Sequence, residues 1–326
     1  MRAPPYRLSV VVPTYQRRAA VRRLLDHLAR QTLPAHDYEV IISIDGSDDG
    51  TREMANRFPA PYALRVLWQP HSGRAAACNA GIRAACGEVV VLLDDDMAPA
   101  PGCLSAHLAA HADGARRGVL GAVPIDANGS SPPVTAYIAA KFNQHLATLA
   151  RADHVFTLRD FYSGNFSMRR ERFLEVGLLD EAFERYGNED LELWLRLSRA
   201  GIQLKYEAEA LARQYYTKSF SELSRDTISK GRTAVLLASK HPEAFAHLKL
   251  ATFHQASYKW RLARAALLGL SATLPPTPAW VIRLVELVER RRPRRLWVLY
   301  DFVLDYCYWL GARLALRESR LRETGA

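Results

Sequence analysis

The chain has 326 residues, about half of them hydrophobic, and a formal net charge of +10. This composition is ordinary for a folded protein, and the length allows one large domain or a core domain with an appended segment. No apolar stretch is long enough to cross a bilayer as a helix, and the four cysteines show neither CxxC spacing nor a disulfide framework. No signal peptide is recognisable, so a cytoplasmic location is expected.

The positive charge is concentrated near the end of the chain. Residues 240–326 contain fifteen Lys or Arg and seven Asp or Glu, whereas residues 1–239 contain twenty-nine and twenty-seven. This asymmetry predicts that the C-terminal segment meets an anionic surface, with a lipid headgroup favoured over nucleic acid.

Strands and helices alternate regularly through the first hundred residues. Short β-branched runs predict buried strands, and apolar residues at helical spacing predict helices between them. The strands are expected at 8–13, 39–44, 64–68 and 87–93, and the helices at 17–30, 51–58 and 75–85. Such alternation with short connections is typical of a parallel sheet with crossover helices.

Beyond Pro99 the alternation is looser. A strand is expected at 119–123, a helix at 134–150, a loop running into a short strand at 161–168, and a helix at 188–200 that ends at Gly201. Three further helices are expected at 254–274, 280–289 and 296–316, and no internal repeat is visible.

Three consecutive carboxylates, Asp94, Asp95 and Asp96, follow the valine-rich strand that begins at Gly87. Like charges at one strand end repel each other unless a cation lies among them. Ligands of open α/β sheets bind beyond the carboxyl ends of the strands, so a divalent cation that carries phosphate oxygens fits this place. A solvated acidic loop or a helix N-terminus is the alternative interpretation.

Two other strand ends carry polar residues that would lie on the same edge of the sheet. The first strand ends at Pro13, Thr14 and Tyr15, and the second at Asp45. Asp45 could accept a hydrogen bond from a pyrimidine ring N–H, with Thr14 and Tyr15 beside the base. Taken alone, Asp45 is as well explained as a turn residue in an Asp-Gly pair.

Five blocks in order resemble the inverting family-2 glycosyltransferases. They are Val11–Tyr15, Ser43–Thr51, Ser72–Ile82, Leu93–Asp96, and Ser163–Arg170 continued by Asn188–Trp194. The resemblance covers roughly residues 7–235. It implies a GT-A fold, an α/β Rossmann-like and mostly parallel sheet flanked by helices. The expected domains are a catalytic domain at 1–240, with a nucleotide-sugar half at about 1–123 and an acceptor half at about 124–240, and a basic helical extension at 241–326.

The resemblance also implies an activity and a set of site residues. The expected activity is metal-dependent transfer from a nucleotide-diphosphate sugar, a UDP-sugar in the first place, with Mn²⁺ or Mg²⁺ as cofactor. By the family pattern Asp45 faces the base, Asp94 lies near the ribose and sugar, Asp96 binds the metal and Asp190 is the catalytic base, with Glu189 beside it. The remaining donor-site residues implied by the pattern are Pro13, Thr14, Tyr15, Arg74, Asn79 and Asp95.

The chemistry agrees with these roles. Direct displacement at an anomeric carbon needs a carboxylate to take the acceptor's proton, and a cation to stabilise the departing diphosphate. At the start of a helix the macrodipole favours ionised Asp190. The alternative for Asp190 is a helix-capping residue.

Two departures from the family pattern bear on the site. Many members have a histidine after the strand that follows the base helix, and Gln214 stands at that place here, with Lys218 near it. Glutamine is a poor ligand for transition metals but an adequate oxygen donor to magnesium. The Gln-x-x-Arg-Trp pattern of processive synthases is missing, which favours transfer of a single sugar. Weaker acceptor or diphosphate contacts are expected at Gly164, Asn165, Gln214 and Lys218.

The last predicted helix is amphipathic, and Trp297, Tyr308 and Trp309 add aromatic surface to it. A basic cluster at 290–295 precedes it. Basic residues beside aromatic amphipathic helices suit a bilayer interface, so an anionic membrane is favoured slightly over a homodimer, with no nucleic acid expected. The enzyme would then lie on the inner face of the cytoplasmic membrane, next to a carbohydrate acceptor of glycolipid or natural-product type.

Two other functions compete with the transferase. A nucleotidyltransferase would carry a glycine-rich phosphate loop after the first strand, but Pro13–Arg18 contains no glycine. A catalytically inactive sugar-nucleotide binder or scaffold is favoured by the missing histidine and disfavoured by the presence of Asp94, Asp96 and Asp190.

Overall fold

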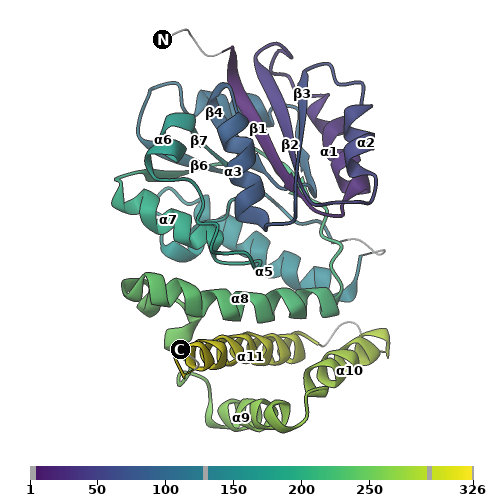
Figure 1. Cartoon of the computed structure of the whole chain (residues 1–326), viewed down its shortest axis with the longest axis vertical. Coiled ribbons are helices and arrows are strands. Elements are labelled where there is room, and N and C mark those ends of the chain that lie inside the picture. Colours follow the sequence, from purple (N-terminus) through teal and green to yellow (C-terminus); the bar gives the residue numbers. More distant parts are fainter. Residues whose placement is uncertain (1–4, 128–130, 292–295, 325–326) are drawn as a thin grey trace. The chain divides into compact units, whose positions relative to one another are not determined.

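The structure is a computed structural model that describes residues 5–127, 131–291 and 296–324. The chain divides into two compact units (Figure 1). The first unit comprises Met1–Asp126, Ala139–Glu184 and Glu189–Tyr216, and the second comprises Ala127–Ile138, Arg185–Asn188 and Thr217–Ala326. The predicted domain boundary at 240 thus falls inside the second unit, and it stays a prediction.

A seven-stranded, mostly parallel sheet forms the centre of the first unit. Its strand order is β3-β2-β1-β4-β7-β6-β8, and only β7 runs antiparallel to its neighbours. The strands are β1 (Tyr6–Thr14), β2 (Tyr38–Asp45), β3 (Ala63–Gln69), β4 (Gly87–Leu93), β6 (Arg117–Gly121), β7 (Asn165–Arg169) and β8 (Gln203–Glu207). A small second sheet pairs β5 (Met97–Pro99) with β9 (Ala212–Gln214). The predicted α/β fold is confirmed.

Helices of the first unit connect these strands. They are α1 (Arg18–Leu28), α2 (Thr51–Asn56), α3 (Arg74–Ala84), α4 (Cys103–Ala109), α6 (Arg170–Glu175) and α7 (Glu189–Arg199), with α5 (Pro133–Leu149) shared between the units. In α1 the residues Val21, Leu24, Leu25 and Leu28 are all buried, because their spacing puts them on one helix face. They pack with valines of β1 and β2 in the core.

The second unit is helical. It contains α8 (Phe220–Lys240), α9 (Tyr258–Thr273), α10 (Thr277–Arg291) and α11 (Trp297–Thr324), together with two 3-10 turns at Pro242–His247 and Lys249–Thr252. Helices α8 and α11 pack at backbone contact: a Cβ at Gly231 would lie 2.0 Å from the Tyr308 carbonyl oxygen, and one at Gly311 1.9 Å from that of Ile228. Helix α8 was not predicted from the sequence, although Ser219 and Glu222 form a capping box at its start.

The prediction that α11 presents an aromatic surface is wrong. Tyr306, Tyr308 and Trp309 are buried in the core of the second unit, and only Trp297 of the predicted aromatic residues is substantially exposed. A helix that is apolar on most sides is typical of the centre of a bundle. Most of the basic cluster at 290–295 lies outside the described residues. Within the described segments, no helix is both long and apolar enough to cross a membrane.

Candidate active site

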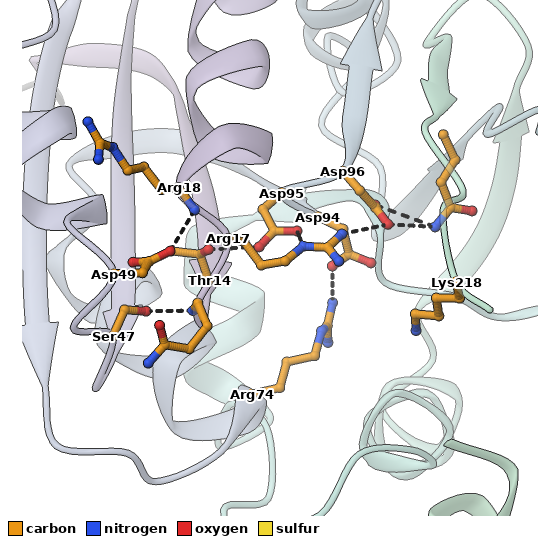
Figure 2. Close-up of polar contacts among 12 residues, drawn as sticks. Thr14, Arg17, Arg18, Ser47, Asp49, Arg74, Asp94, Asp95, Asp96 and Lys218 are labelled. Atoms are coloured by element: carbon orange, nitrogen blue, oxygen red, sulfur yellow. Dashed lines mark hydrogen bonds and ion pairs between the residues drawn. The ribbon is translucent and has the colours of Figure 1, made fainter. Parts of the chain in front are cut away.

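The carboxyl ends of β1 and β4 meet through a hydrogen bond between their terminal side chains. The Thr14 hydroxyl donates to Asp95 Oδ2 at 2.7 Å, and Arg17 lies 3.4 Å from both Asp95 and Asp96 (Figure 2). Strand β1 pairs with β4 in parallel, which brings these residues to one edge of the sheet. The structure therefore assembles the predicted edge from Thr14 and the aspartates, and it adds Arg17, which the sequence analysis did not single out.

The loops that follow β1 and β2 are tied together by side chains that accept from backbone N–H groups. Ser47 accepts from Gln16 at 2.8 Å, and Asp49 accepts from Arg18 at 2.9 Å (Figure 2). These bonds fix the backbone on either side of Arg17, so its guanidinium is held over the acidic edge. Asp49 thus has a structural role in shaping the site.

The three consecutive aspartates are not equivalent. The pKa of Asp96 is raised to about 6, chiefly by burial and also by the neighbouring Asp94 and Asp95, against the opposing effect of Arg17 and Gln214. Burial also raises the pKa of Asp95, although Arg17 and the Thr14 hydroxyl favour its ionised form. Both Asp95 and Asp96 are therefore carboxylates whose ionised form an added cation would stabilise.

Gln214 reaches Asp96 across the small second sheet. Strands β5 and β9 place Met97 opposite Gln214, and the Gln214 amide donates to the Asp96 carboxylate at 3.3 Å. The backbone N–H of Tyr215 also donates to the Asp96 carbonyl at 2.8 Å. The residue that stands where the family pattern has histidine is thus in contact with the predicted metal ligand.

The protein groups around Asp96 fit a cation that takes most of its ligands from bound molecules and not from the protein. Among the described residues, no three His, Cys, Asp or Glu side chains converge as a metal site. One buried carboxylate with an unfavourable charge, and one amide that can rotate to present its oxygen, suit Mg²⁺ or Mn²⁺ bound mainly through phosphate oxygens and water. A closed, all-protein metal cage is not what these residues provide.

Arg74 connects the acidic edge with the start of α7. Its guanidinium donates to Asp94 at 2.7 Å and to the Ser163 hydroxyl at 3.1 Å, and it lies 3.5 Å from Glu189. Burial alone would lower the pKa of Arg74, but Asp94 and Glu189 raise it well above its usual value, so the guanidinium stays charged. Three separate blocks of the sequence pattern thus meet at one side chain, and Ser163 is a further contact that residue type alone did not reveal.

Gly164 allows the backbone after Ser163 to approach Asp94 closely. Its carbonyl accepts from the Asp94 N–H at 2.9 Å, and a Cβ at this position would lie 2.6 Å from the Asp94 carboxylate. Gly164 lies at the predicted site, where it lines the space beside Asp94.

Asp45 is buried at the end of β2, and its carboxylate already has four protein donors. It accepts from the backbone N–H groups of Ser72 and Gly73 at 2.8 and 2.9 Å, from the Gln69 amide at 3.0 Å, and lies 2.8 Å from His71 Nδ1. These contacts order the loop before α3. A nucleobase N–H would therefore have to replace one of the two side-chain donors.

Beside Asp45, the rings of Tyr15 and His71 are stacked with centroids 4.4 Å apart. Both side chains are about half exposed or more. Tyr15 was predicted from the sequence as a site residue, but His71 was not. The position of His71, directly before the Ser72–Ile82 block, could have pointed to it as a site residue.

Glu189 and Asp190 begin α7, where the macrodipole favours negative charge. Glu189 is 3% exposed and faces Arg74, whereas Asp190 is partly exposed and accepts from the Leu191 N–H at 2.8 Å. Of the two, Asp190 is the carboxylate that a bound molecule can reach.

Two predicted site residues make internal hydrogen bonds that hold neighbouring segments together. The buried Asn79 amide donates to the Leu179 carbonyl and to Glu181, and accepts from the Leu179 N–H, so it holds that turn against α3. Asn165 is fully buried and bonds His107 and the carbonyls of Ala122 and Ala210. These bonds occupy both amides, and the substrate contacts expected from the sequence for the two residues stay predictions.

Lys218 belongs to the second unit, where its ammonium donates to Asp226 at 2.6 Å and lies over the ring of Tyr186. Burial acts to lower the pKa of Lys218, but Tyr186 and Asp226 raise it above its usual value. Its predicted contact with a diphosphate or acceptor stays a prediction. Pro13 is buried within β1, and its predicted contact with the donor also stays a prediction.

Comparison with known proteins identifies the family of this arrangement. The model described as "Glycosyl transferase family 2" matches residues 9–178, just over half of the chain, and that described as "N-terminal domain of galactosyltransferase" matches residues 144–219. Validoxylamine A glucosyltransferase of Streptomyces hygroscopicus subsp. jinggangensis is 31% identical over an alignment of 227 residues, which covers 62% of this chain and 54% of that protein. The chain spans about half the length of such curated relatives.

Solved structures share the fold. The mannosyltransferase PcManGT from Pyrobaculum calidifontis, in complex with GDP-Man and Mn²⁺, superposes with a TM-score of 0.59 at 22% identity, covering 94% of this chain and 86% of that one. S. aureus TarS 1–349 in complex with UDP-GlcNAc gives 0.54 at 16% identity, covering 96% and 91%. At such identities the likeness establishes the GT-A fold.

Proposed function

Because this chain belongs to glycosyl transferase family 2, we propose that it transfers one sugar from a nucleotide-diphosphate sugar to an acceptor hydroxyl, with inversion at the anomeric carbon. The observation that carries the proposal is the Arg74 bridge. It joins Asp94, at the edge where a diphosphate and sugar would lie, to the start of the helix that bears Asp190.

In the proposed reaction Asp190 is the general base. The acceptor hydroxyl gives its proton to the Asp190 carboxylate while its oxygen forms a bond to the anomeric carbon. The bond from that carbon to the diphosphate oxygen breaks on the opposite side, and the nucleoside diphosphate leaves with the electron pair. Glu189 is disfavoured as the base because it is buried and faces a permanently charged guanidinium.

A divalent cation, Mn²⁺ or Mg²⁺, would be held by Asp96 and by the Gln214 amide oxygen after rotation of that amide. When bound, it would act as a Lewis acid that neutralises charge on the departing diphosphate. Arg17 would adjust to its presence, since the guanidinium now lies at the same carboxylate. The PcManGT complex contains Mn²⁺, which supports Mn²⁺ as the first ion to test.

We propose that the nucleobase lies near the stacked rings of Tyr15 and His71. A flat aromatic pair with a buried carboxylate beside it suits a planar, hydrogen-bonding ring. UDP-sugars are the first donors to test, and GDP-sugars the second, because the neighbouring structures contain UDP-GlcNAc and GDP-Man.

The proposed acceptor is a carbohydrate or a hydroxylated natural product, free or lipid-linked. The relative named for validoxylamine A supports a small acceptor and a single transfer. Of the other predicted partners, an anionic membrane and a second copy of the chain concern the helices of the second unit and not the donor site.

A donor screen by thermal shift, followed by turnover assays, tests the proposal. A donor at many times its dissociation constant raises the melting temperature measurably. We expect Asp190→Asn to retain this shift while losing turnover by at least about a hundredfold. Asp26→Asn, at an exposed aspartate on α1, is the matched control and should behave like wild type.

Two results would contradict the proposal. Turnover of a donor–acceptor pair by Asp190→Asn at the wild-type rate would remove Asp190 from the mechanism. Donor binding by the wild type with no turnover against a broad acceptor panel would favour the inactive sugar-nucleotide binder instead.

A further inference from the structure

Helices α9 and α10 of the second unit carry large apolar side chains on the sides that face solvent. These residues form what we call the α9–α10 face, and each is between 42% and 73% exposed: Tyr258, Leu262, Leu270, Trp280, Leu284 and Leu287. Exposed apolar side chains scattered singly are normal, but six on two consecutive helices form a pattern that marks an interaction surface.

The exposed residues lie opposite the buried ones on each helix. In α10 the inward side has Ile282 and Val285, whereas Leu284 and Leu287 point outward. In α9 the inward side has Arg264 and Leu268, and the outward side has Tyr258, Leu262 and Leu270. Both helices therefore carry large apolar side chains on the side that faces solvent, in addition to those on the side that packs in the core. In Figure 1, α9 lies on the side of α11 away from α8.

The charges of these helices are sorted by side. The sequence of α9 contains no Asp or Glu, and Lys259 and Arg261 are exposed on it. The two acidic residues of α10 are turned inward: Glu289 accepts from the Tyr300 hydroxyl at 2.6 Å, and Glu286 accepts from the Ser221 N–H at 3.1 Å. On its outward side α10 exposes Arg283 and Arg291. In the described parts of α9 and α10, the charges that accompany the exposed apolar residues are thus all positive.

We propose that the α9–α10 face binds the surface of an anionic lipid bilayer. Leu, Trp and Tyr side chains would enter the boundary between headgroups and acyl chains. The charged ends of the long, flexible Lys and Arg side chains would contact lipid phosphates. With 16 residues, α9 is about 24 Å long, too short to span a bilayer, so it would lie in the interface plane.

A second copy of the chain fits this face less well. In a symmetric dimer the same patch meets itself, so Lys259, Arg261, Arg283 and Arg291 would be brought toward their own copies. That arrangement repels, whereas anionic headgroups attract all four.

The proposal differs from the one that the sequence suggested, because the aromatic residues of α11 are in the core and the contact moves to α9 and α10. It requires neither a particular donor nor a particular acceptor. Failure of membrane binding and failure of the proposed transfer are therefore separate results, and donor hydrolysis measured on each variant tells them apart.

Co-sedimentation with vesicles tests the proposal. The full chain should pellet with phosphatidylcholine vesicles that contain about a third phosphatidylglycerol, and much less with pure phosphatidylcholine or in 0.5 M salt. The double variant Leu262→Glu/Leu284→Glu should lose binding. The variant Lys259→Gln/Arg283→Gln should bind about twentyfold more weakly, since each basic residue near the surface contributes roughly a factor of five.

Val155→Glu is the matched control, because Val155 is 80% exposed and belongs to the first unit. It should bind vesicles like wild type, and all variants should keep the wild-type circular dichroism spectrum. The proposal is overturned if wild type does not pellet with anionic vesicles or if Leu262→Glu/Leu284→Glu pellets equally well. A wild-type dimer that the same double substitution converts to monomer, without any vesicle binding, would assign the face to a second copy.

Discussion

Replacing Asp96 by asparagine should stabilise the metal-free protein at neutral pH. The pKa of this carboxyl is raised from 3.8 to about 6 in the folded protein, chiefly by burial, so its ionised form is unfavourable there. A carboxylate that binds no ligand would not be expected at such a position, because its ionised form destabilises the folded protein. A cost of this kind is typical of a functional site, where ligand binding rather than folding has selected the residue.

The magnitude follows from the pKa shift. About two pKa units at about 1.4 kcal/mol each give an upper limit of roughly 3 kcal/mol for the cost of ionised Asp96. The favourable effect of Arg17 on ionised Asp96 is already part of this shift, and in the variant Arg17 keeps its partner Asp95. We therefore expect a net gain of about 2 kcal/mol for Asp96→Asn, or roughly 4–8 °C in apparent melting temperature.

The pH dependence has a defined sign. A carboxyl with a raised folded pKa favours the folded state most below the unfolded pKa of 3.8, and this contribution is lost as the pH rises through about 6. Asparagine does not titrate, so its advantage over wild type should be about half as large at pH 5 as at pH 7.5.

The assay is thermal unfolding of wild type and Asp96→Asn in EDTA across this pH range, then with Mn²⁺. Added Mn²⁺ should raise the melting temperature of wild type and have a much smaller effect on the variant. Asp26→Asn is the control and should change neither quantity, since Asp26 is exposed. An Asp96→Asn protein no more stable than wild type at pH 7.5, or a difference that does not change with pH, would refute the reasoning.

Three further predictions follow from individual contacts. Arg17→Gln should tighten Mn²⁺ binding several-fold in calorimetry, because a competing positive charge leaves the acidic edge; unchanged or weaker binding would contradict this. Gly164→Ala should lower kcat/KM at least tenfold, because a Cβ there would lie 2.6 Å from Asp94; wild-type kinetics would show that the loop can give way. Asp305→Asn should destabilise the second unit by about 3 kcal/mol in urea unfolding, because it leaves the buried Arg264 guanidinium without its partner; a loss below about 1 kcal/mol would count against the ion pair.

The sequence was sufficient for the central strands β1, β2 and β4 because they are largely buried on both faces, whereas the edge strand β8, which is only partly buried, was not predicted. Runs such as Val10–Val12 and Val89–Val91 are apolar at every position and do not alternate with polar residues. This pattern predicts a central parallel strand. The end of β4 in three aspartates was equally visible. What composition could not show was that the pKa values of Asp95 and Asp96 are raised, because that depends chiefly on how deeply the fold buries each carboxyl.

The C-terminal helices were harder to interpret, because an amphipathic pattern does not say which partner covers the apolar side. From the sequence, Trp309 and Tyr308 on α11 were predicted to form a membrane-binding surface. They pack instead in a helical core, where the Trp309 ring N–H donates to Asp305. Helix α8, which supplies part of that core, was missed because it has a long mixed sequence with a glycine in its middle. Only the packing partners, and not the pattern, distinguish a core helix from an interfacial one.

If the proposed function is correct, charge at the acidic edge would make the cation and the diphosphate bind together. Four carboxylates, from Asp94, Asp95, Asp96 and Glu189, contact two guanidinium groups, from Arg17 and Arg74. With all groups ionised the cluster is negative and would repel the diphosphate of a donor, even though Arg17 and Arg74 are both present. A divalent cation would cancel that excess, and its remaining ligand positions would be filled by the phosphate oxygens that the edge otherwise rejects. In the proposed function, the same carboxylates that make the metal-free site costly would therefore make donor binding conditional on the metal.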